Sequence, residues 1–202
     1  MALSVKDRVS VAQRALGKSM VAINPDAAHD AQGKANGFLC VGIKDTTDIP
    51  NSLIKRIKKS SNYLILSVDH MSDMGRSVDT DLINPLTYRP MTGSTSGGAI
   101  NVCKGIVDIC IGTDGGGSVL APALATNLFA FMGKGIGLVG GESCSTDGIP
   151  FTTGIGFIGN SFLAIEKIAT FSSNIDFSNT EHDKLETFNA PIKIVIPCKG
   201  DA

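Results

Sequence analysis

The sequence has no excess of charge of either sign, no long hydrophobic run and no paired cysteine spacing. Its 18 lysine and arginine residues nearly balance 19 aspartate and glutamate residues, so the net charge is −1. A nucleic-acid surface needs a basic excess, and we therefore expect no nucleic-acid partner. The most apolar stretch, residues 119–132, contains Pro122 and Asn127 and is shorter than a membrane-spanning helix, so we expect no membrane span.

The cysteines and the amino-terminal stretch bear on the cellular compartment. The five cysteines form no CxxC pair, which argues against a zinc site and against a disulfide framework. We expect Cys103 and Cys110 to be small core residues. The opening stretch, MALSVKDRVSVAQRAL, lacks the apolar segment of a signal peptide. These features together predict a cytoplasmic protein without a metal.

The sequence does have enough length and apolar content for one sizeable core. It has 202 residues, of which 43% are hydrophobic and 18% charged, and these values are typical of a globular protein. We therefore expect a single domain over residues 1–202. The mean hydropathy of +0.17 is high for a soluble monomer, so we also expect a homo-oligomer or a partner chain.

Short apolar runs alternate with amphipathic segments along the chain. The runs predict strands at residues 38–43, 63–68, 106–114 and 190–197, and the amphipathic segments predict helices at residues 3–20, 52–62, 97–105 and 161–171. Residues 69–92 contain two prolines and little periodicity, which indicates an ordered loop. Near-continuous apolar strands that alternate with helices predict an α/β fold with a mostly parallel or mixed sheet and flanking helices.

Two segments rich in glycine and serine lie in the middle of the chain: GSTSGG at residues 93–98 and GTDGGGS at residues 112–118. The second follows an apolar strand, at the end of the sheet where open α/β folds bind ligands. Its glycines can direct several N–H groups to one point, as a phosphate nest or an oxyanion hole does. No Gly-Lys-Ser/Thr ending is present, which disfavours a nucleotide-binding P-loop. A flexible turn without chemistry is the alternative.

Two further segments, GIGLVG at residues 135–140 and GIGFIG at residues 154–159, match the dinucleotide-binding pattern G-x-G-x-x-G. The first lacks a strand-turn-helix context. The second follows GIPFTT, which makes a poor central strand, and neither has a clear acidic partner. We therefore expect no dinucleotide cofactor.

A serine becomes a nucleophile only when a nearby base removes its proton. The three histidines, residues 29, 70 and 182, lie in no recognisable catalytic motif. A neutral lysine can act as the base if burial lowers its pKa. Lys44 follows a predicted buried strand and suits this role, although a surface lysine is the alternative.

Four segments together resemble the amidase signature family of serine hydrolases. They are GFLCVGIKDTTDIP at 37–50, NPLTYRPMTGSTSGGAINVCKG at 84–105, DICIGTDGGGSVLAPA at 108–123 and TDGIPFTTGIGFIGNSFLAIEKIA at 146–169. The resemblance has its core at about residues 84–160. It accounts for both G-x-G-x-x-G matches without a cofactor.

The resemblance implies a role for each residue of the site. Ser118 would be the nucleophile, Ser94 a serine preceded by a cis peptide bond, and Lys44 the base; the two serines lie 24 residues apart, as in the family. The backbone N–H groups of Gly115, Gly116, Gly117 and Ser118 would hold the oxyanion. Thr95 and Ser96 would supply hydroxyl groups behind the triad, and Asp114 would brace the loop. The substrate would be a small-molecule amide, with no metal and no organic cofactor.

The sequence also departs from the family pattern. Family members are about twice as long, so the resemblance implies a shortened form whose acyl pocket is incomplete. Leu120 stands where an arginine is common, Thr95 replaces a serine, and Gly115 stands where a larger residue is usual. Two alternatives to a free-standing amidase stay open. One is the glutamine-hydrolysing part of an amidotransferase that passes ammonia to a partner, and the other is a non-catalytic half-domain kept for assembly.

Overall fold

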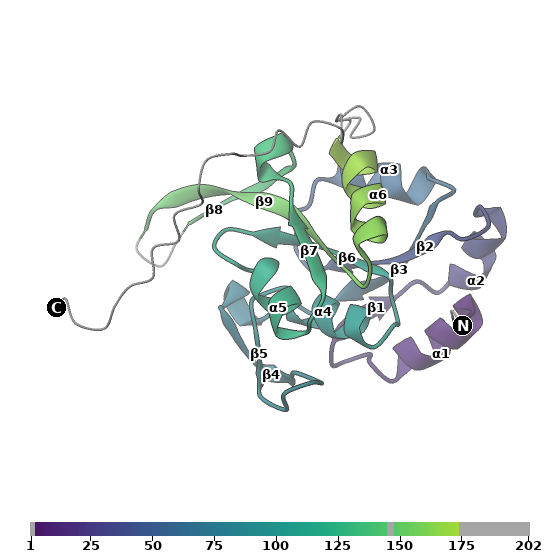
Figure 1. Ribbon diagram of the computed structural model, residues 1–202, viewed down its shortest axis with the longest axis horizontal. Helices are drawn as coiled ribbons and strands as arrows, with labels where there is room; N and C mark the ends of the chain where they lie inside the picture. Colours follow the sequence, from purple (N-terminus) through teal and green to yellow (C-terminus); the bar gives the residue numbers. More distant parts are fainter. Residues whose placement is uncertain (1–2, 145–147, 174–202) are drawn as a thin grey trace, which may run out of the picture.

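A seven-stranded sheet forms the centre of the molecule in the computed structural model, which describes residues 3–144 and 148–173. The strand order is β1-β3-β2-β6-β9-β7, and β8 pairs with β9. The strands are β1 (Met20–Ile23), β2 (Leu39–Lys44), β3 (Tyr63–Asp69), β6 (Ile109–Asp114), β7 (Phe129–Met132), β8 (Val139–Cys144) and β9 (Pro150–Gly159). The β8–β9 hairpin extends away from the body of the molecule (Figure 1).

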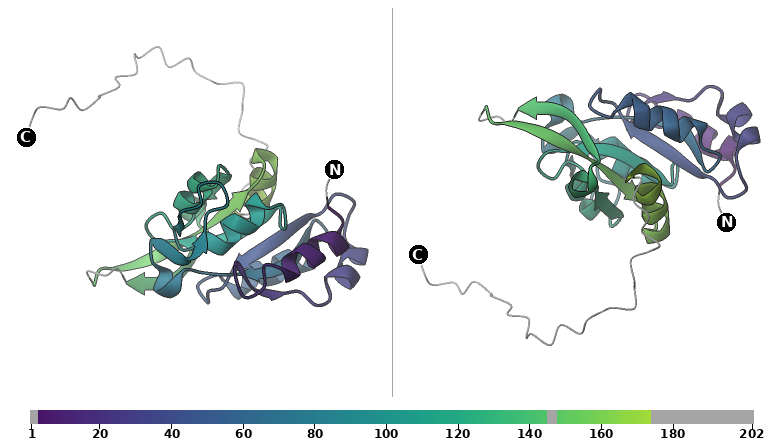
Figure 2. Two further views of the ribbon diagram at one scale, coloured as in Figure 1. Left: turned by 90° about the horizontal axis from the view of Figure 1, so that it is seen from below. Right: turned by 90° about the horizontal axis from the view of Figure 1, so that it is seen from above.

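Helices cover both faces of this sheet (Figures 1 and 2). On one face, α3 (Asn51–Lys59) and α6 (Phe162–Ser173) pack with β-strand residues around Ile109 and Phe157. On the other face lie α1 (Val5–Gln13), α2 (Ala27–Asp30), α4 (Ser96–Cys103) and α5 (Leu120–Ala125). The result is one continuous sheet between two apolar layers, as the sequence predicts.

The sheet is mixed. β2 runs parallel to both β3 and β6, whereas β1, β7, β8 and β9 pair antiparallel with their neighbours. The parallel strands β2, β3 and β6 end in Lys44, Asp69 and Asp114. Because the carboxyl ends of parallel strands meet at one edge, these three polar residues lie at the same edge of the sheet.

Six predicted elements match observed ones. The predictions for 38–43, 52–62, 63–68, 97–105, 106–114 and 161–171 correspond to β2, α3, β3, α4, β6 and α6. The first helix is shorter than predicted, because α1 ends at Gln13 and β1 begins at Met20. Ser4 caps that helix, since its Oγ accepts a hydrogen bond from the Asp7 N–H at 3.2 Å. The predicted strand at 190–197 lies outside the described residues.

The prediction of a loop over residues 69–92 is wrong in part. This segment contains β4 (Val78–Ile83) and β5 (Pro90–Thr92), which form a small antiparallel sheet. The side chains of β4 that point inward are Asp79 and Leu82. A buried aspartate places a polar residue where an alternating strand usually has an apolar one, so the hydrophobic pattern does not indicate this strand.

Two further segments have defined positions in the fold. GIGFIG is the part of β9 that pairs with β6 and β7, whereas residues 150–153, from the segment expected to make a poor central strand, pair with β8 in the outer hairpin. The apolar stretch 119–132 divides into α5 and β7. Within the described residues, no helix has the length and apolar character needed to cross a membrane.

Helix α4 lies unusually close to the sheet. A Cβ atom at Gly98 would be only 2.0 Å from the Cys110 Sγ on β6. A larger residue at position 98 would require Cys110 or the helix to move. Consequently the amino-terminal end of α4, which follows Ser94, lies beside the carboxyl ends of β2 and β6.

Candidate active site

Lys44 is the last residue of β2, and its side chain is almost completely buried, with 3% of the residue exposed. Its Nζ donates hydrogen bonds to the Ser94 Oγ at 2.7 Å, the Thr113 Oγ1 at 3.1 Å and the Thr113 carbonyl oxygen at 3.2 Å. Three acceptors match the three donors of an ammonium group. The lysine is therefore held in one orientation, with Ser94 as its nearest hydroxyl partner.

Burial also changes the acidity of this lysine. Desolvation lowers the pKa of Lys44 from 10.5 to about 8, although the negative charges of Asp48 and Asp114 act in the opposite direction. A substantial fraction of Lys44 is then neutral at mildly alkaline pH. A neutral lysine amine can accept a proton, so the group has the chemistry of a general base.

Ser94 is 2% exposed and begins the loop that leads into α4. The cis peptide bond implied before it is not present, because no peptide bond among the described residues is cis. Gly93 instead makes the turn with a left-handed φ of 72°. Glycine adopts this conformation without strain, whereas a cis bond before a residue other than proline costs about 2.5–4 kcal/mol. The Ser94 hydroxyl contacts Lys44 with a trans bond before it.

Ser118 lies on the loop between β6 and α5 and is half-buried. Its carbonyl oxygen accepts a hydrogen bond from the Thr95 N–H at 3.0 Å, which joins the two glycine-rich loops. Within residues 3–144 and 148–173, no hydrogen bond involves the Ser118 Oγ. Lys44, Ser94 and Ser118 all line one cavity of about 670 Å³. The three residues to which the family resemblance assigns catalysis therefore line one cavity, and two of them, Lys44 and Ser94, are in direct contact.

Asp114, the last residue of β6, braces the loop that carries Ser118. Its Oδ1 accepts hydrogen bonds from the N–H groups of Gly116 and Gly117 at 2.8 and 2.5 Å, and its Oδ2 accepts one from Val119 at 2.6 Å. Two of the four predicted oxyanion donors are therefore used by Asp114. The other two predicted donors are the N–H groups of Gly115 and Ser118.

The other two hydroxyl residues behind the site have different surroundings. Thr95 is fully buried, and its Oγ1 has no hydrogen-bond partner in the described part of the chain. The Ser96 Oγ donates a short hydrogen bond to the Oδ2 of buried Asp79. The Nε2 of His70 is 3.2 Å from the same oxygen. The bond between Ser96 and Asp79 anchors the start of α4. Asp79 and His70 both lie in residues 69–92, the segment predicted to be a loop.

Sequence reasoning missed two residues that hold the site. Thr113 supplies two of the three acceptors of Lys44, and Asp79 holds Ser96. Thr113 could have been found from its place directly before Asp114 in the second glycine-rich segment. Asp79 gave no comparable signal. His70, Asp79 and Asp81 have potential ligand atoms within 4.8 Å of one another, so they are the described residues that could hold a metal.

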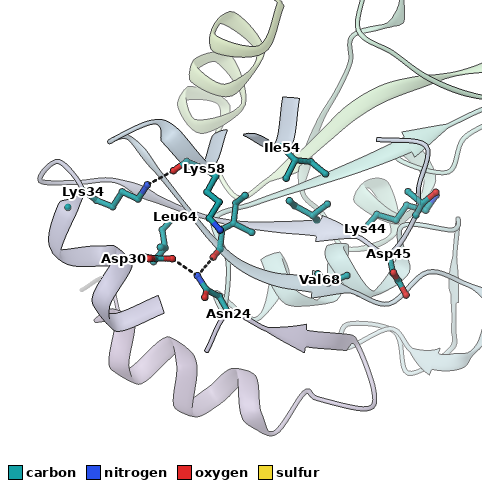
Figure 3. Close-up of a pocket in the computed structure, with 13 residues that line it drawn as sticks. Asn24, Asp30, Lys34, Lys44, Asp45, Ile54, Lys58, Leu64 and Val68 are labelled. Atoms are coloured by element: carbon teal, nitrogen blue, oxygen red, sulfur yellow. Dashed lines mark hydrogen bonds between the residues drawn. The ribbon is translucent and has the colours of Figure 1, made fainter. Parts of the chain in front are cut away.

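A second cavity, of about 510 Å³, lies beside β2, β3 and α3 and also reaches Lys44 (Figure 3). Some of its polar groups bond to one another: the Asn24 Nδ2 donates to Asp30, and the Lys34 Nζ donates to the carbonyl oxygens of Lys58 and Ser60. Asp45 lines this cavity rather than the first one. Neither Ser94 nor Ser118 lines it, so the candidate site lies in the larger cavity.

No family model matches the chain, and no curated protein matches it in sequence. Solved structures do match. One is 6-aminohexanoate cyclic dimer hydrolase, with a TM-score of 0.68 and 15% identity over 87% of this chain and 44% of that one. Another is the peptide amidase from Stenotrophomonas maltophilia, with a TM-score of 0.60 and 16% identity over 87% of this chain and 46% of that one.

A third match is an amidase family protein from Bacillus anthracis str. Ames, with a TM-score of 0.61 and 17% identity over 91% of this chain and 46% of that one. These neighbours are amidase-signature enzymes. The chain has an amidase-signature-like fold. It spans less than half the length of the three structures. The amidase-signature-like fold therefore accounts for the sheet, the helical layers and the meeting of the two glycine-rich loops.

Proposed function

We propose that the protein hydrolyses carboxamides through an acyl-enzyme on Ser118. The observation that carries the proposal is the 2.7 Å hydrogen bond between the buried Lys44 Nζ and the Ser94 Oγ, in the cavity that Ser118 also lines. A lysine that is buried at the end of a strand and bonded to a serine hydroxyl is costly to retain for stability alone. It is well suited to activating a serine.

In the proposed reaction, the Ser118 Oγ attacks the amide carbon and transfers its proton through the Ser94 hydroxyl to neutral Lys44. The N–H groups of Gly115 and Ser118 stabilise the negative charge on the carbonyl oxygen, and each such donor is worth about 3 kcal/mol in other hydrolases. The C–N bond then breaks, and the proton returns through Ser94 to the leaving amine. Water hydrolyses the ester on Ser118 by the same relay.

A fluorophosphonate probe tests this proposal without knowledge of the substrate. We expect one phosphonylated residue, Ser118, by intact mass and peptide mapping. The labelling rate should rise with pH through about 8, because only neutral Lys44 accepts the proton. Labelling should be lost in Ser118→Ala and reduced at least about a hundredfold in Ser94→Ala and Lys44→Ala.

Ser77→Ala is the matched control, because Ser77 lines the same cavity but makes no contact with Lys44. Its labelling rate should equal that of the natural sequence. A folded natural chain that the probe leaves unmodified across pH 7–10 would contradict the proposed function.

A further inference from the structure

Three charged side chains line the cavity that contains the site: Lys44, Asp48 and Arg76. Lys44 is bonded to Ser94 and Thr113. Arg76 has 66% of its side chain exposed, and its guanidinium lies 3.6 Å from an oxygen of Asp73. Asp48 is half-buried, and within the described residues its carboxylate makes no hydrogen bond and no ion pair. It is thus an anionic group in the cavity whose charge is not matched by a direct contact.

The backbone around Asp48 is fixed on both sides. The Asp48 N–H donates to the Thr46 Oγ1 at 3.2 Å, and its carbonyl oxygen accepts from the Gly141 N–H on β8 at 3.0 Å. The next residue, Ile49, is buried in the core. A carboxylate on so constrained a backbone is already oriented before a ligand arrives, which reduces the entropic cost of binding.

The charge balance of the cavity depends on the state of Lys44. While Lys44 carries a proton, its positive charge lies close enough to Asp48 for the two to interact. When Lys44 is neutral, as the proposed reaction requires, this positive charge is lost from the cavity. An uncompensated, partly desolvated carboxylate is unfavourable, so the active form of the site favours a cation in the cavity.

We propose that Asp48 binds a cationic group of the substrate, so that the preferred substrates are amides with an ammonium or similar cation on the acyl chain. This inference rests on the proposed function. It adds a substrate class to the site and makes Asp48 the residue that determines specificity.

Binding of such a cation also changes the base. The charged or titratable groups that act on Lys44 are Cys110, Asp48 and Asp114, and each raises its pKa. A cation bound at Asp48 cancels one of these contributions, so the pKa of Lys44 falls when the substrate binds. A cationic substrate therefore promotes the neutral, proton-accepting form of Lys44, whereas an isosteric neutral amide does not.

The test compares two amides of similar shape, 4-aminobutanamide and pentanamide, at pH 8. We expect kcat/KM for the cationic amide to exceed that for the neutral one at least about tenfold, as for other charge-assisted contacts. Asp48→Asn should reduce this ratio to about one, mainly by lowering the value for 4-aminobutanamide. Asp45→Asn is the matched control and should keep the full preference, because Asp45 is exposed and lines the other cavity.

A binding measurement separates this inference from the proposed function. In Ser118→Ala, calorimetry should detect tighter binding of 4-aminobutanamide than of pentanamide, and Asp48→Asn in the same background should remove the difference. If the two amides are hydrolysed or bound equally well, or if the preference for the cationic amide survives Asp48→Asn, the role of Asp48 is overturned. The proposed hydrolysis is not affected by that result. A third outcome is possible, in which Ser118→Ala binds the cationic amide more tightly but the probe does not label the natural chain. That outcome would support the cation site at Asp48 and contradict the proposed hydrolysis.

Discussion

Ser94 and Ser118 line the same cavity, but the chain holds them in different ways. The Ser94 hydroxyl is buried against Lys44, and its loop is tied to neighbouring segments through Thr95 and through the contact of Ser96 with Asp79. Ser118 is half-buried, and within the described chain its hydroxyl is unbonded. In the proposed reaction Ser94 passes protons along a fixed path, whereas Ser118 rotates toward a substrate. The contrast suits a fixed relay and a mobile nucleophile.

The difference between the two serines can be tested first by removing each hydroxyl group in turn. Ser118→Ala and Ser94→Ala should both reduce amide hydrolysis by roughly 10⁴-fold or more. Only Ser94→Ala should reduce the free energy of unfolding, by about 1–3 kcal/mol, because the buried Lys44 Nζ loses its shortest hydrogen bond. Ser118→Ala should leave stability within about 0.5 kcal/mol of the natural chain. Urea denaturation measures the free energy of unfolding of both variants. An equal loss of stability in the two variants would show that the chain holds the two serines in the same way.

The second prediction concerns the base beside Ser94. The pKa of Lys44 is about 8 in the folded chain and 10.5 when unperturbed, as in an unfolded chain, so between these values the unfolded state binds more protons. Stability relative to Lys44→Met should therefore rise with pH across this window, by about 3 kcal/mol in total. Below pH 8 the difference should be constant.

Urea titrations of both chains from pH 6 to pH 10.5 measure this difference. Lys104→Met is the control, because Lys104 is exposed, and its curve should run parallel to that of the natural chain. A Lys44→Met curve that also runs parallel would mean that burial does not perturb this lysine.

The third and smallest effect is expected at the loop of Ser118. Asp114→Asn replaces a carboxylate that accepts hydrogen bonds from Gly116, Gly117 and Val119 with an amide that has one acceptor oxygen. We expect a loss of about 1–2 kcal/mol in stability and a similar loss in kcat, with KM little changed. Asp73→Asn, at an exposed site, is the control. An unchanged kcat would show that the loop does not need this brace to orient Ser118.

Much of the scaffold was predictable because apolar runs and helical periodicity are local. Lys44 could be placed at a strand end, since the run before it is apolar and the residues after it are polar. The meeting of Lys44 with Ser94, 50 residues later, is not a local property, and only the family resemblance suggested it. Thr113 escaped notice because part of its contribution is a carbonyl oxygen, which every residue has.

The errors have identifiable physical causes. β4 was hidden by the buried Asp79, whose partners Ser96 and His70 are distant in the sequence. The trans bond before Ser94 differs from the expectation because Gly93 supplies the turn by its own φ angle.

The contact of Gly98 with the sheet also bears on how this sequence can change over time. A Cβ atom at that position would be 2.0 Å from the Cys110 Sγ and 2.9 Å from the Cys110 Cβ, so a larger residue requires Cys110 or α4 to move. Exposed positions such as Lys58 and Lys59 on α3 face no such restriction. Positions 98 and 110 are therefore coupled, and a larger residue at position 98 is tolerated only if the Cys110 side chain or the helix gives way.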